Sequence, residues 1–184
     1  LGVVMVPRMA STFASGDKKQ IQGYLKMSFR FVFFLAFPIM FGIISISEAF
    51  VPVFFGAGYD KVVVLINIIS PILLLMGVAN VLGTQYLLPT KHQKEYTISV
   101  AIGVVFNFIA NYILITKYAS IGASIATVLS ELLVVIIQYQ YMKKEVPFKE
   151  LLSLAWKYFL AGILMFVLYV IIYSDLSFKL IRIE

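Results

Sequence analysis

Long runs of apolar residues alternate with short polar and basic segments along this chain. Stretches without Lys, Arg, Asp or Glu, apart from Glu131 in the fourth, cover about residues 31–47, 62–90, 96–116, 118–142 and 158–174. A helix needs roughly 17 to 25 mostly apolar residues to cross a hydrocarbon core about 30 Å thick. The pattern therefore predicts five transmembrane helices, the second with a tilt or a kink near Pro71.

These runs fit helices better than the strands of a membrane barrel. A barrel strand alternates apolar and polar residues over about ten positions. Segments such as Val62–Ile69 and Ile163–Ile172 are instead apolar on every side. Such segments suit helices in lipid, whose backbone groups pair within the segment itself. The expected fold class is all-α, a polytopic transmembrane helical bundle.

The composition supports a protein whose solvent is lipid. Hydrophobic residues make up 61% of the chain and charged residues 13%, and the mean hydropathy is +0.97. A soluble domain must show water a mostly polar surface, whereas a helix in lipid can be apolar all round. The net charge of +6 does not indicate nucleic acid, because the basic residues lie between apolar runs. We expect membrane lipid, and no nucleic acid, among the partners.

The loops between the predicted spans differ in their content of Lys and Arg. Five of these residues precede the first span, two follow the second and four join the fourth to the fifth, whereas the other side holds four. Cytoplasmic loops of membrane proteins are enriched in Lys and Arg. The larger set is therefore predicted to face the cytoplasm, and Glu48 and Asp60 the opposite side.

The segment before the first span predicts two further features. Leu1–Val6 is apolar and stops at Pro7, so we interpret it as the tail of an earlier span and the chain as a fragment that begins inside a helix. Between Asp17 and Lys26, apolar residues share a helical face opposite lysines. This arrangement is typical of a short interfacial helix on the membrane surface.

Glu131 is the one acidic or basic residue inside a predicted span. A charged side chain at the centre of a membrane helix costs about 2.5 to 3.5 kcal/mol on insertion scales, so Glu131 should face the protein interior, find a partner or be protonated. A stripe at helical spacing, directed at a partner or cavity, consists of Ala123, Thr127, Glu131, Val134 and Gln138. Two roles stay open for Glu131: an interhelical hydrogen bond by a neutral acid, and ion coupling or substrate gating.

The third and fourth spans carry rows of small and polar residues. Gly103, Asn107 and Asn111 occur at every fourth position. Such a face can pack against a neighbouring helix and hydrogen-bond to it, or line a hydrophilic path. A second row, interpreted as packing, consists of Gly122, Ala126 and Ser130.

The second span also carries polar residues that point to a cavity. Asn67, Ser70 and Gln85 fall roughly on one side of a helical wheel. A cavity lining is one interpretation of this side, although Pro71 interrupts the wheel.

Catalytic and metal chemistry find little support in the sequence. Both usually need several convergent ionisable groups. The chain has no Cys, and its one histidine, His92, lies in a polar stretch typical of a solvated loop. Gly56–Gly58 is too short for a phosphate-binding loop and is interpreted as a turn. We therefore expect no catalytic residue, no metal and no cofactor.

Several segments of the chain resemble a known family. In chain order these are Leu1–Met9, Phe37–Gly42, Val51–Tyr59, Gly83–Thr90, Asn107 with Asn111, and Ile121–Thr127 running on to Glu131. Together they resemble the bacterial polysaccharide flippases that export lipid-linked O-antigen or capsule repeat units. That family shares a superfamily with the multidrug and toxic compound extrusion transporters and the lipid II flippases.

The resemblance implies a transporter in the bacterial cytoplasmic (inner) membrane. Residues 1–145 are similar to the second helical bundle of such a flippase, and residues 146–184 hold an additional span with its flanks. Two bundles would rock around a central cavity, and the missing N-terminal bundle would be a partner in the same chain. The substrate implied is a polyprenyl-pyrophosphate-linked oligosaccharide, moved to the outer leaflet for surface polysaccharide biosynthesis.

The resemblance also guides the choice of site residues. Relatives line the cavity with basic residues, which suit a pyrophosphate. No Lys or Arg lies deep in any span here, so such cations either lie in the missing N-terminal half or are limited to Lys26 and Arg30 at the cavity mouth. The residues predicted to border the substrate path, or else to pack helices together, are Asn67, Gln85, Asn107, Asn111 and Glu131.

Two other functions compete with the flippase. A cation-coupled multidrug exporter of the same superfamily would use Glu131 as a coupling site. An integral-membrane enzyme, such as a polysaccharide polymerase or glycosyltransferase, would need a large outer loop with catalytic groups. The outer loops have about a dozen residues at most, so we predict that the protein is not an enzyme.

Overall fold

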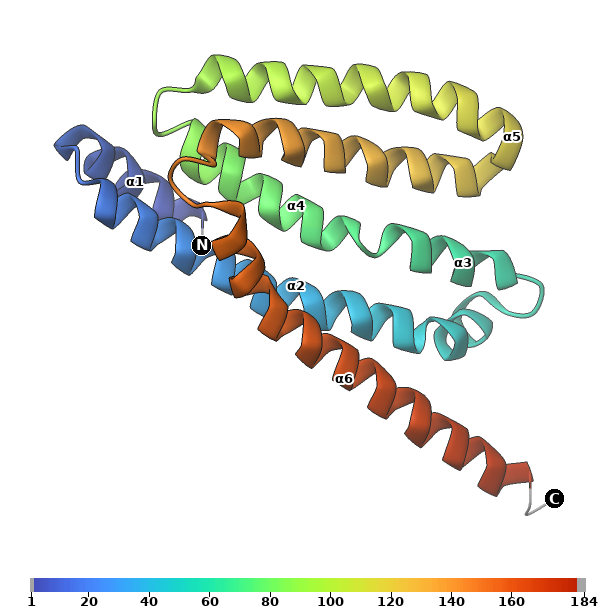
Figure 1. Ribbon diagram of the computed structural model, residues 1–184. Helices are drawn as coiled ribbons and strands as arrows, with labels where there is room; N and C mark the ends of the chain where they lie inside the picture. The colour runs from blue at the N-terminus through green and yellow to red at the C-terminus, as the bar shows by residue number, and fades with distance from the viewer. Residues whose placement is uncertain (1, 182–184) are drawn as a thin grey trace.

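A computed structural model describes residues 2–181, and the side chains of residues 5–173 (Figure 1). Leu1, where the first predicted domain begins, and residues 182–184, where the second ends, lie outside the described residues. The elements are α1 (Gly2–Ser15), α2 (Lys18–Phe55), α3 (Asp60–Ile69), α4 (Ile72–Asn80), the π-helix η1 (Val81–Leu87), α5 (Gln93–Met142) and α6 (Phe148–Ile181). No strand occurs in residues 2–181, and the expected all-α helical bundle is confirmed.

The helix α5 consists of two antiparallel arms that lie side by side (Figure 1). They meet at Ala119, whose φ of 50° and ψ of −127° are not helical. A side chain at Gly122 would overlap the carbonyl oxygen of Leu114, so glycine lets the chain reverse this tightly. Within the described residues, four apolar segments are long enough to cross a membrane, and the one formed by α5 folds back on itself and so can cross twice. The third and fourth predicted spans fall on its two arms.

The long helix α2 differs from the sequence expectation. Asp17 begins the helix, because its side chain accepts a hydrogen bond from the backbone N–H of Gln20 at 3.0 Å. The helix then runs unbroken through the region expected to form a separate interfacial helix, since no proline occurs before Pro38. Its 38 residues extend about 57 Å at 1.5 Å per residue, longer than a hydrocarbon core of about 30 Å. The first turns of α2 therefore project beyond the core.

The second predicted span is divided into three pieces. The helix α3 ends at Ile69, and α4 starts at Ile72 after Ser70 and Pro71. Proline has no N–H to donate to the preceding turn, which explains this break. The wider turns of η1 follow directly, with the N–H of Leu88 bonded to the carbonyl of Gly83 at 3.0 Å. The sequence predicted the kink and missed the π-helix.

The buried core lies at one end of the bundle, and most of the remaining surface is apolar. The side chains with no exposed surface include Met9, Leu25, Phe29, Leu82, Leu87, Met142 and Val146. They come from α1, α2, η1, α5 and the segment after it, so this end holds the bundle together. Along the spans, large apolar side chains such as Phe108, at 76% exposed, point outward. That distribution suits a surface covered by lipid.

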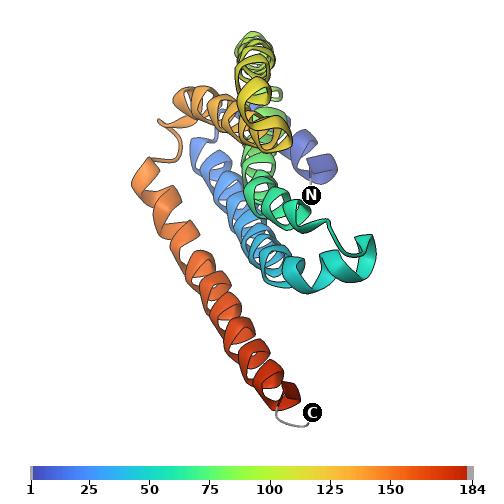
Figure 2. The same cartoon turned by 90° about the vertical axis from the view of Figure 1, so that its right-hand side faces the viewer.

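The last helix, α6, packs along α2 and then leaves the bundle. Phe37 and Phe159 meet edge to face with ring centroids 5.7 Å apart, and a side chain at Gly162 would overlap the ring of Phe41. Figures 1 and 2 both show the later part of α6 extending away from the other helices. Much of its surface therefore has no partner within the described residues.

The connections between helices gather at two opposite ends (Figure 1). The turn before α2, residues 88–92 and residues 143–147 lie at one end, whereas residues 56–59 and the turn at Ala119 lie at the other. The loops that the sequence grouped by their content of Lys and Arg thus lie together. The cytoplasmic assignment of that basic end remains a prediction.

Cysteine labelling of the whole protein tests this orientation. The chain has no Cys, so each introduced thiol is unique within it. Ser15→Cys and Lys91→Cys should be protected from an impermeant thiol reagent added outside intact cells, because their loops face the cytoplasm. Lys117→Cys, near the opposite end, is the control that should react. Labelling of the first two from outside would reverse the orientation.

Candidate functional site

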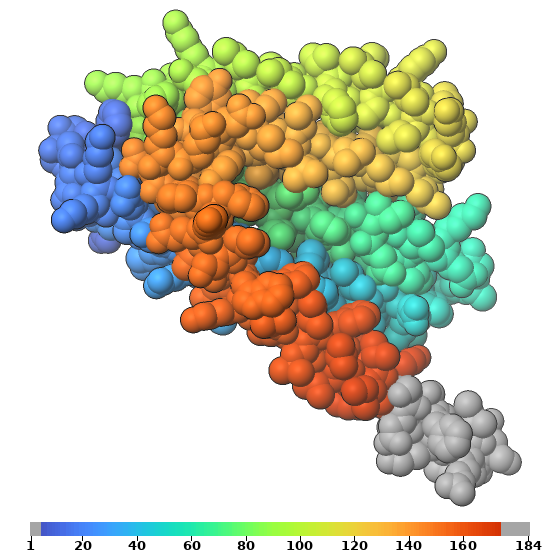
Figure 3. All heavy atoms as spheres, viewed as in Figure 1, coloured from blue at the N-terminus to red at the C-terminus, as the bar shows by residue number. Residues whose placement is uncertain are grey.

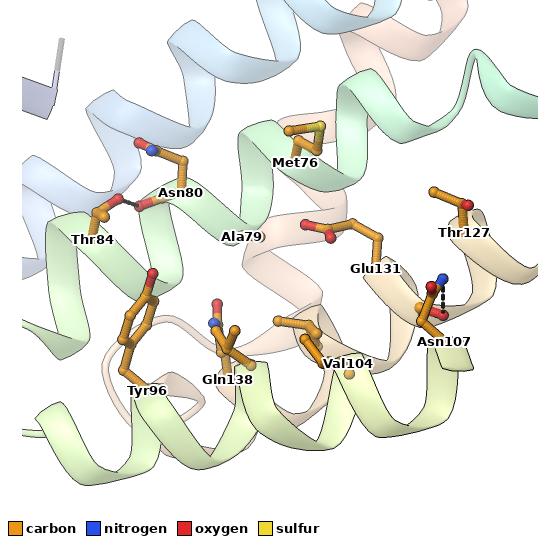
Figure 4. A pocket seen from close by; sticks show the side chains of 14 residues that line it. Met76, Ala79, Asn80, Thr84, Tyr96, Val104, Asn107, Thr127, Glu131 and Gln138 are labelled. Carbon is orange, nitrogen blue, oxygen red and sulfur yellow. Dashed lines mark hydrogen bonds between the residues drawn. The ribbon is translucent and has the colours of Figure 1, made fainter. Parts of the chain in front are cut away.

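A polar pocket of about 450 Å³ lies between α4, η1 and both arms of α5 (Figure 4). Its apolar walls include Met76 and Val104. Its polar lining consists of Asn80, Thr84, Tyr96, Asn107, Thr127, Ser130, Glu131 and Gln138. No Lys or Arg lines it. The pocket is therefore a hydrogen-bonding surface inside a bundle whose exterior is mostly apolar.

The pocket forms where small residues let the two arms of α5 approach each other. A side chain at Gly103 would overlap the side chain of Val134 on the other arm. On the second arm Gly122, Ala126 and Ser130 are all buried. Helices in lipid associate through such close contacts, because burial of apolar surface gives no advantage there. The row of small residues found in the sequence thus lies inside the protein.

Asn107 joins the two arms and also lines the pocket. Its Nδ2 donates to the hydroxyl of Ser130 at 3.0 Å, and its Oδ1 accepts from Nδ2 of Asn111 at 2.8 Å. Asn111 lies one turn away and is not among the lining residues. At Asn107 the packing role and the path-lining role therefore occur together.

The carboxylate of Glu131 extends from the second arm of α5 across the pocket toward α4 (Figure 4). The side chain is half-buried. No hydrogen bond or ion pair reaches it from the side chains that the structure describes. The carboxylate therefore presents its acceptor sites to the pocket interior rather than to a neighbouring helix.

Gln138 supplies a second unsatisfied acceptor. The residue is 1% exposed, and its Nε2 donates to the hydroxyl of Ser99 at 3.1 Å. Its Oε1 is buried and has no hydrogen-bond partner among the described residues. A buried acceptor without a partner is costly, so a ligand with donor groups would gain free energy there. Four of the five stripe residues, from Thr127 to Gln138, line the pocket.

The other two predicted path residues lie elsewhere. Gln85 is 3% exposed and connects helices: its Oε1 accepts from Ser28 of α2 at 2.7 Å, and its Nε2 donates to Oδ1 of Asn80 at 3.0 Å. Asn67 accepts from the hydroxyl of Ser47 at 3.2 Å, beside a separate, smaller cavity. The structure thus places Asn107 and Glu131 in the lining, with Asn111 hydrogen-bonded to Asn107 outside it, and Gln85 and Asn67 elsewhere.

The sequence did not identify Asn80, Thr84 and Tyr96 as lining residues. A wheel with the period of a regular helix assigns a fixed angle to each residue. The break at Pro71 and the wide turns of η1 change those angles, so Asn80 and Thr84 face the pocket while Gln85 turns toward α2. The sequence offered no reason to place Tyr96 in a pocket, because tyrosines are common at membrane interfaces for other reasons.

The two candidate cations lie outside the pocket lining. Nζ of Lys26 is 2.6 Å from Oε1 of Glu150 on α6, and both side chains are about a third exposed. Such a surface ion pair typically contributes 0 to about 1 kcal/mol. Arg30 is exposed on α2. No group of acidic, His or Cys side chains that could hold a metal occurs among the described residues.

A family profile described as "Lipid II flippase MurJ" matches residues 1–181. The chain belongs to the lipid II flippase MurJ family. The superfamily resemblance noted in the sequence is confirmed, and the chain is a multi-pass protein of the cytoplasmic membrane.

Two relatives and one solved structure are similar to this MurJ-family chain. A "Putative O-antigen transporter" of Escherichia coli (strain K12) is 31% identical over 98 residues, which are 53% of this chain and 23% of the relative. A "Probable low-salt glycan biosynthesis flippase Agl15" of Haloferax volcanii is 25% identical over 144 residues, 78% of this chain and 30% of the relative. The chain therefore spans less than a third of either relative.

The fold is that of a solved flippase. "Lipid II flippase MurJ, inward closed conformation" superposes with a TM-score of 0.67 at 21% identity, over 98% of this chain and 44% of that one. At this identity the likeness concerns the fold. The arrangement of the helices around the pocket is therefore that of part of a flippase.

The close contact at Gly103 yields a stability prediction. Gly103→Leu should destabilise the protein by about 1 to 3 kcal/mol, because the new side chain must displace Val134 of the facing arm. Ala101→Leu, at an exposed position two residues away, is the matched control and should change stability little. Thermal unfolding in detergent measures both. Equal melting temperatures would show that the two arms are not held this closely.

Proposed function

We propose that the whole protein is a flippase for lipid-linked, polyprenyl-pyrophosphate-bound oligosaccharides in surface polysaccharide biosynthesis, and that residues 1–145 form its second bundle. Membership of the MurJ family supports a flippase. The names of the two relatives, an O-antigen transporter and a glycan biosynthesis flippase, support an oligosaccharide as the cargo. Residues 146–184 add a further span with its flanks.

The observation that carries the proposal is the polar pocket beside the arms of α5. Amide, hydroxyl and carboxylate groups line it, and these groups hydrogen-bond to sugar hydroxyls. An unpaired polar group in an apolar environment costs roughly 2 to 7 kcal/mol. A glycan with many hydroxyls therefore needs such a surface to pass the bilayer.

The lining also suggests which part of the substrate it contacts. A pyrophosphate needs cationic or N–H donors, and no Lys or Arg lines this pocket. The carboxylate of Glu131, which lines the pocket, would repel phosphate oxygens and accept hydrogen bonds from sugar hydroxyls. We assign the glycan to this pocket, and the pyrophosphate to cations at the cavity mouth, such as Arg30, or on the N-terminal bundle.

Alternating access would complete the mechanism. Two bundles that rock around a site between them expose it first to one side of the membrane and then to the other. The pocket would form one wall of that site, and the N-terminal bundle the opposite wall. The acceptors of this pocket keep the glycan hydrogen-bonded while neither side is open.

The proposed activity is transport, without bond chemistry. Acid and base catalysis needs at least one positioned group whose partner is within reach. Within the pocket, Glu131 is the single carboxylate, and the residues around it are amides, hydroxyls and apolar side chains. These groups are suited to bind and release a substrate.

A cation-coupled exporter of the same superfamily is the second candidate. The observation that favours it is the half-buried carboxylate of Glu131, which has no partner among the described side chains. Such a group could bind and release a proton during transport. The two candidates differ in whether the charge or only the hydrogen-bonding capacity of this side chain is needed.

Water access to the pocket distinguishes a path from internal packing. In the whole protein, Thr127→Cys and Glu131→Cys should react with a water-soluble thiol reagent, because both positions line the pocket. Gln85→Cys should be protected, since Gln85 is buried between α2 and η1. Leu129→Cys, at a position on the same arm that is 42% exposed and does not line the pocket, is the matched control. Protection of all four positions would leave only the packing role.

Substitutions of Glu131 test how the carboxylate acts. Glu131→Leu should lower flipping in proteoliposomes about tenfold or more, since hydrogen bonds to a charged group contribute roughly 1.5 to 3 kcal/mol. Glu131→Gln keeps acceptor capacity and should retain most activity at every pH. Leu132→Ala, on the lipid-facing side, should leave flipping unchanged. Loss of transport in Glu131→Gln at every pH would favour the exporter.

A further inference from the structure

A second, smaller cavity lies between α2, α3 and α6. Its volume is about 170 Å³, and its polar lining comes from Ser45 and Glu48 of α2 and Asn67 of α3. Glu48 lies seven residues before Phe55, the last residue of α2, which places it about 10 Å along the helix from the end opposite the basic loops. That depth is close to the level where lipid head groups meet acyl chains.

The third wall of this cavity is aromatic. Helix α6 contributes Phe166, Tyr169 and Tyr173. The rings of Tyr169 and Tyr173 are stacked, with centroids 5.8 Å apart and an angle of 13° between their planes. Aromatic faces attract cations through their quadrupole, and a nearby carboxylate adds to this attraction. The combination favours a positively charged ligand.

Glu48 is an exposed residue at the edge of the cavity. No ion pair or hydrogen bond reaches it from the side chains that the structure describes. The ion pair between Lys26 and Glu150, which also joins α2 to α6, lies toward the opposite, basic end of these helices. Lys61 is the second residue of α3, at the same end as Glu48, and among the described side chains no ion pair joins the two. A negative charge is therefore left in a cavity that borders lipid.

Hydrogen bonding within the lining restricts the kind of cation. The hydroxyl of Ser45 donates to the carbonyl of Phe41 at 2.7 Å, so toward the cavity it can only accept. Oδ1 of Asn67 accepts one bond from Ser47 and keeps a second lone pair. Glu48, Ser45 and Oδ1 of Asn67 therefore offer acceptors to the cavity, whose lining also contains the amide N–H groups of Asn67 and the hydroxyls of Tyr169 and Tyr173. A primary ammonium has three N–H donors for these acceptors, whereas a quaternary ammonium has none.

We propose that this cavity binds the primary ammonium head group of a phospholipid of the ethanolamine type. The ammonium lies against Glu48, and Ser45 and Asn67 accept its remaining hydrogen bonds. The acyl chains follow the apolar groove where α6 leaves α2, past Ile44 and Val170. This site is independent of the oligosaccharide pocket and does not rest on the proposed transport function.

The surroundings favour a lipid over a free amine. Helix α6 is the outermost element on the face shown in Figure 3, with α2 beside it. Val170, which lines the cavity, is 46% exposed. A phospholipid beside α6 can place its head group in the cavity and its chains along this apolar surface, and so bury apolar surface as well. A free amine gains only the polar contacts.

Lipid retention by the purified whole protein tests the proposal. Native mass spectrometry compares binding of phosphatidylethanolamine, its N,N-dimethyl derivative and phosphatidylcholine with identical acyl chains. Phosphatidylethanolamine should bind about tenfold more tightly than phosphatidylcholine, because a charge-assisted hydrogen bond is lost on methylation. The dimethyl lipid should lie between them. Equal binding of the three lipids would overturn the proposal.

Matched variants locate the site. Glu48→Gln should remove the preference for phosphatidylethanolamine, whereas Glu95→Gln, near the basic end, should keep it. Ser45→Val is a second variant that fills the cavity and should also remove the preference without a change of charge. Melting temperatures in lipid-free detergent establish that the compared variants are folded. A preference that persists in both Glu48→Gln and Ser45→Val would place lipid selection elsewhere.

A competition experiment separates the two sources of an ammonium group. Soluble ethanolamine, added at the same concentration as the lipid, should not displace phosphatidylethanolamine, since it lacks acyl chains to contact α6. Displacement at equal concentration would assign the cavity to a free amine and overturn the lipid assignment.

Discussion

The two arms of α5 are held together without help from the hydrophobic effect. Lipid tails solvate apolar side chains as well as another helix does, so association depends on close packing and on hydrogen bonds. Gly103 and Gly122 supply the close approach. The pairs Asn107 with Ser130 and Gln138 with Ser99 supply hydrogen bonds between the arms. The position of the arms relative to α4 and η1 in turn sets the width of the pocket.

This constraint explains why packing residues and pocket residues overlap. A polar side chain in a membrane helix must face the protein interior, and there it can either join helices or line a cavity. Asn107 does both, because an amide has separate donor and acceptor ends. Gln138 is similar: its Nε2 joins the arms, while its Oε1 is left without a partner beside the pocket. The two interpretations of such residues are therefore not exclusive.

The sequence predicted the helices well, because the hydrocarbon core of the membrane requires long apolar stretches that are visible directly in the sequence. It was also sufficient for the stripe from Thr127 to Gln138, since that arm of α5 is a regular helix. It left Gln85 open between path and packing; the structure turns this residue toward α2, because the π-helix η1 changes the angular spacing that a helical wheel assumes. Asn67 is hydrogen-bonded to Ser47, which lies twenty residues away on α2. Partners distant in sequence cannot be read from one helix alone.

The distribution of charge along the bundle separates the surfaces that the proposed substrate would meet. The basic loops form one end, Glu48 lies toward the other, and the pocket between them has acceptors but no cation in its lining. A lipid-linked oligosaccharide has two chemically distinct polar parts, a dianionic pyrophosphate and a neutral glycan. A surface of carboxylate and amide oxygens binds the neutral part and disfavours the anionic one, because like charges repel strongly in a low-dielectric site. If the glycan occupies this pocket, the pyrophosphate is bound toward the basic end or on the other bundle, so transport requires both surfaces to act on one molecule.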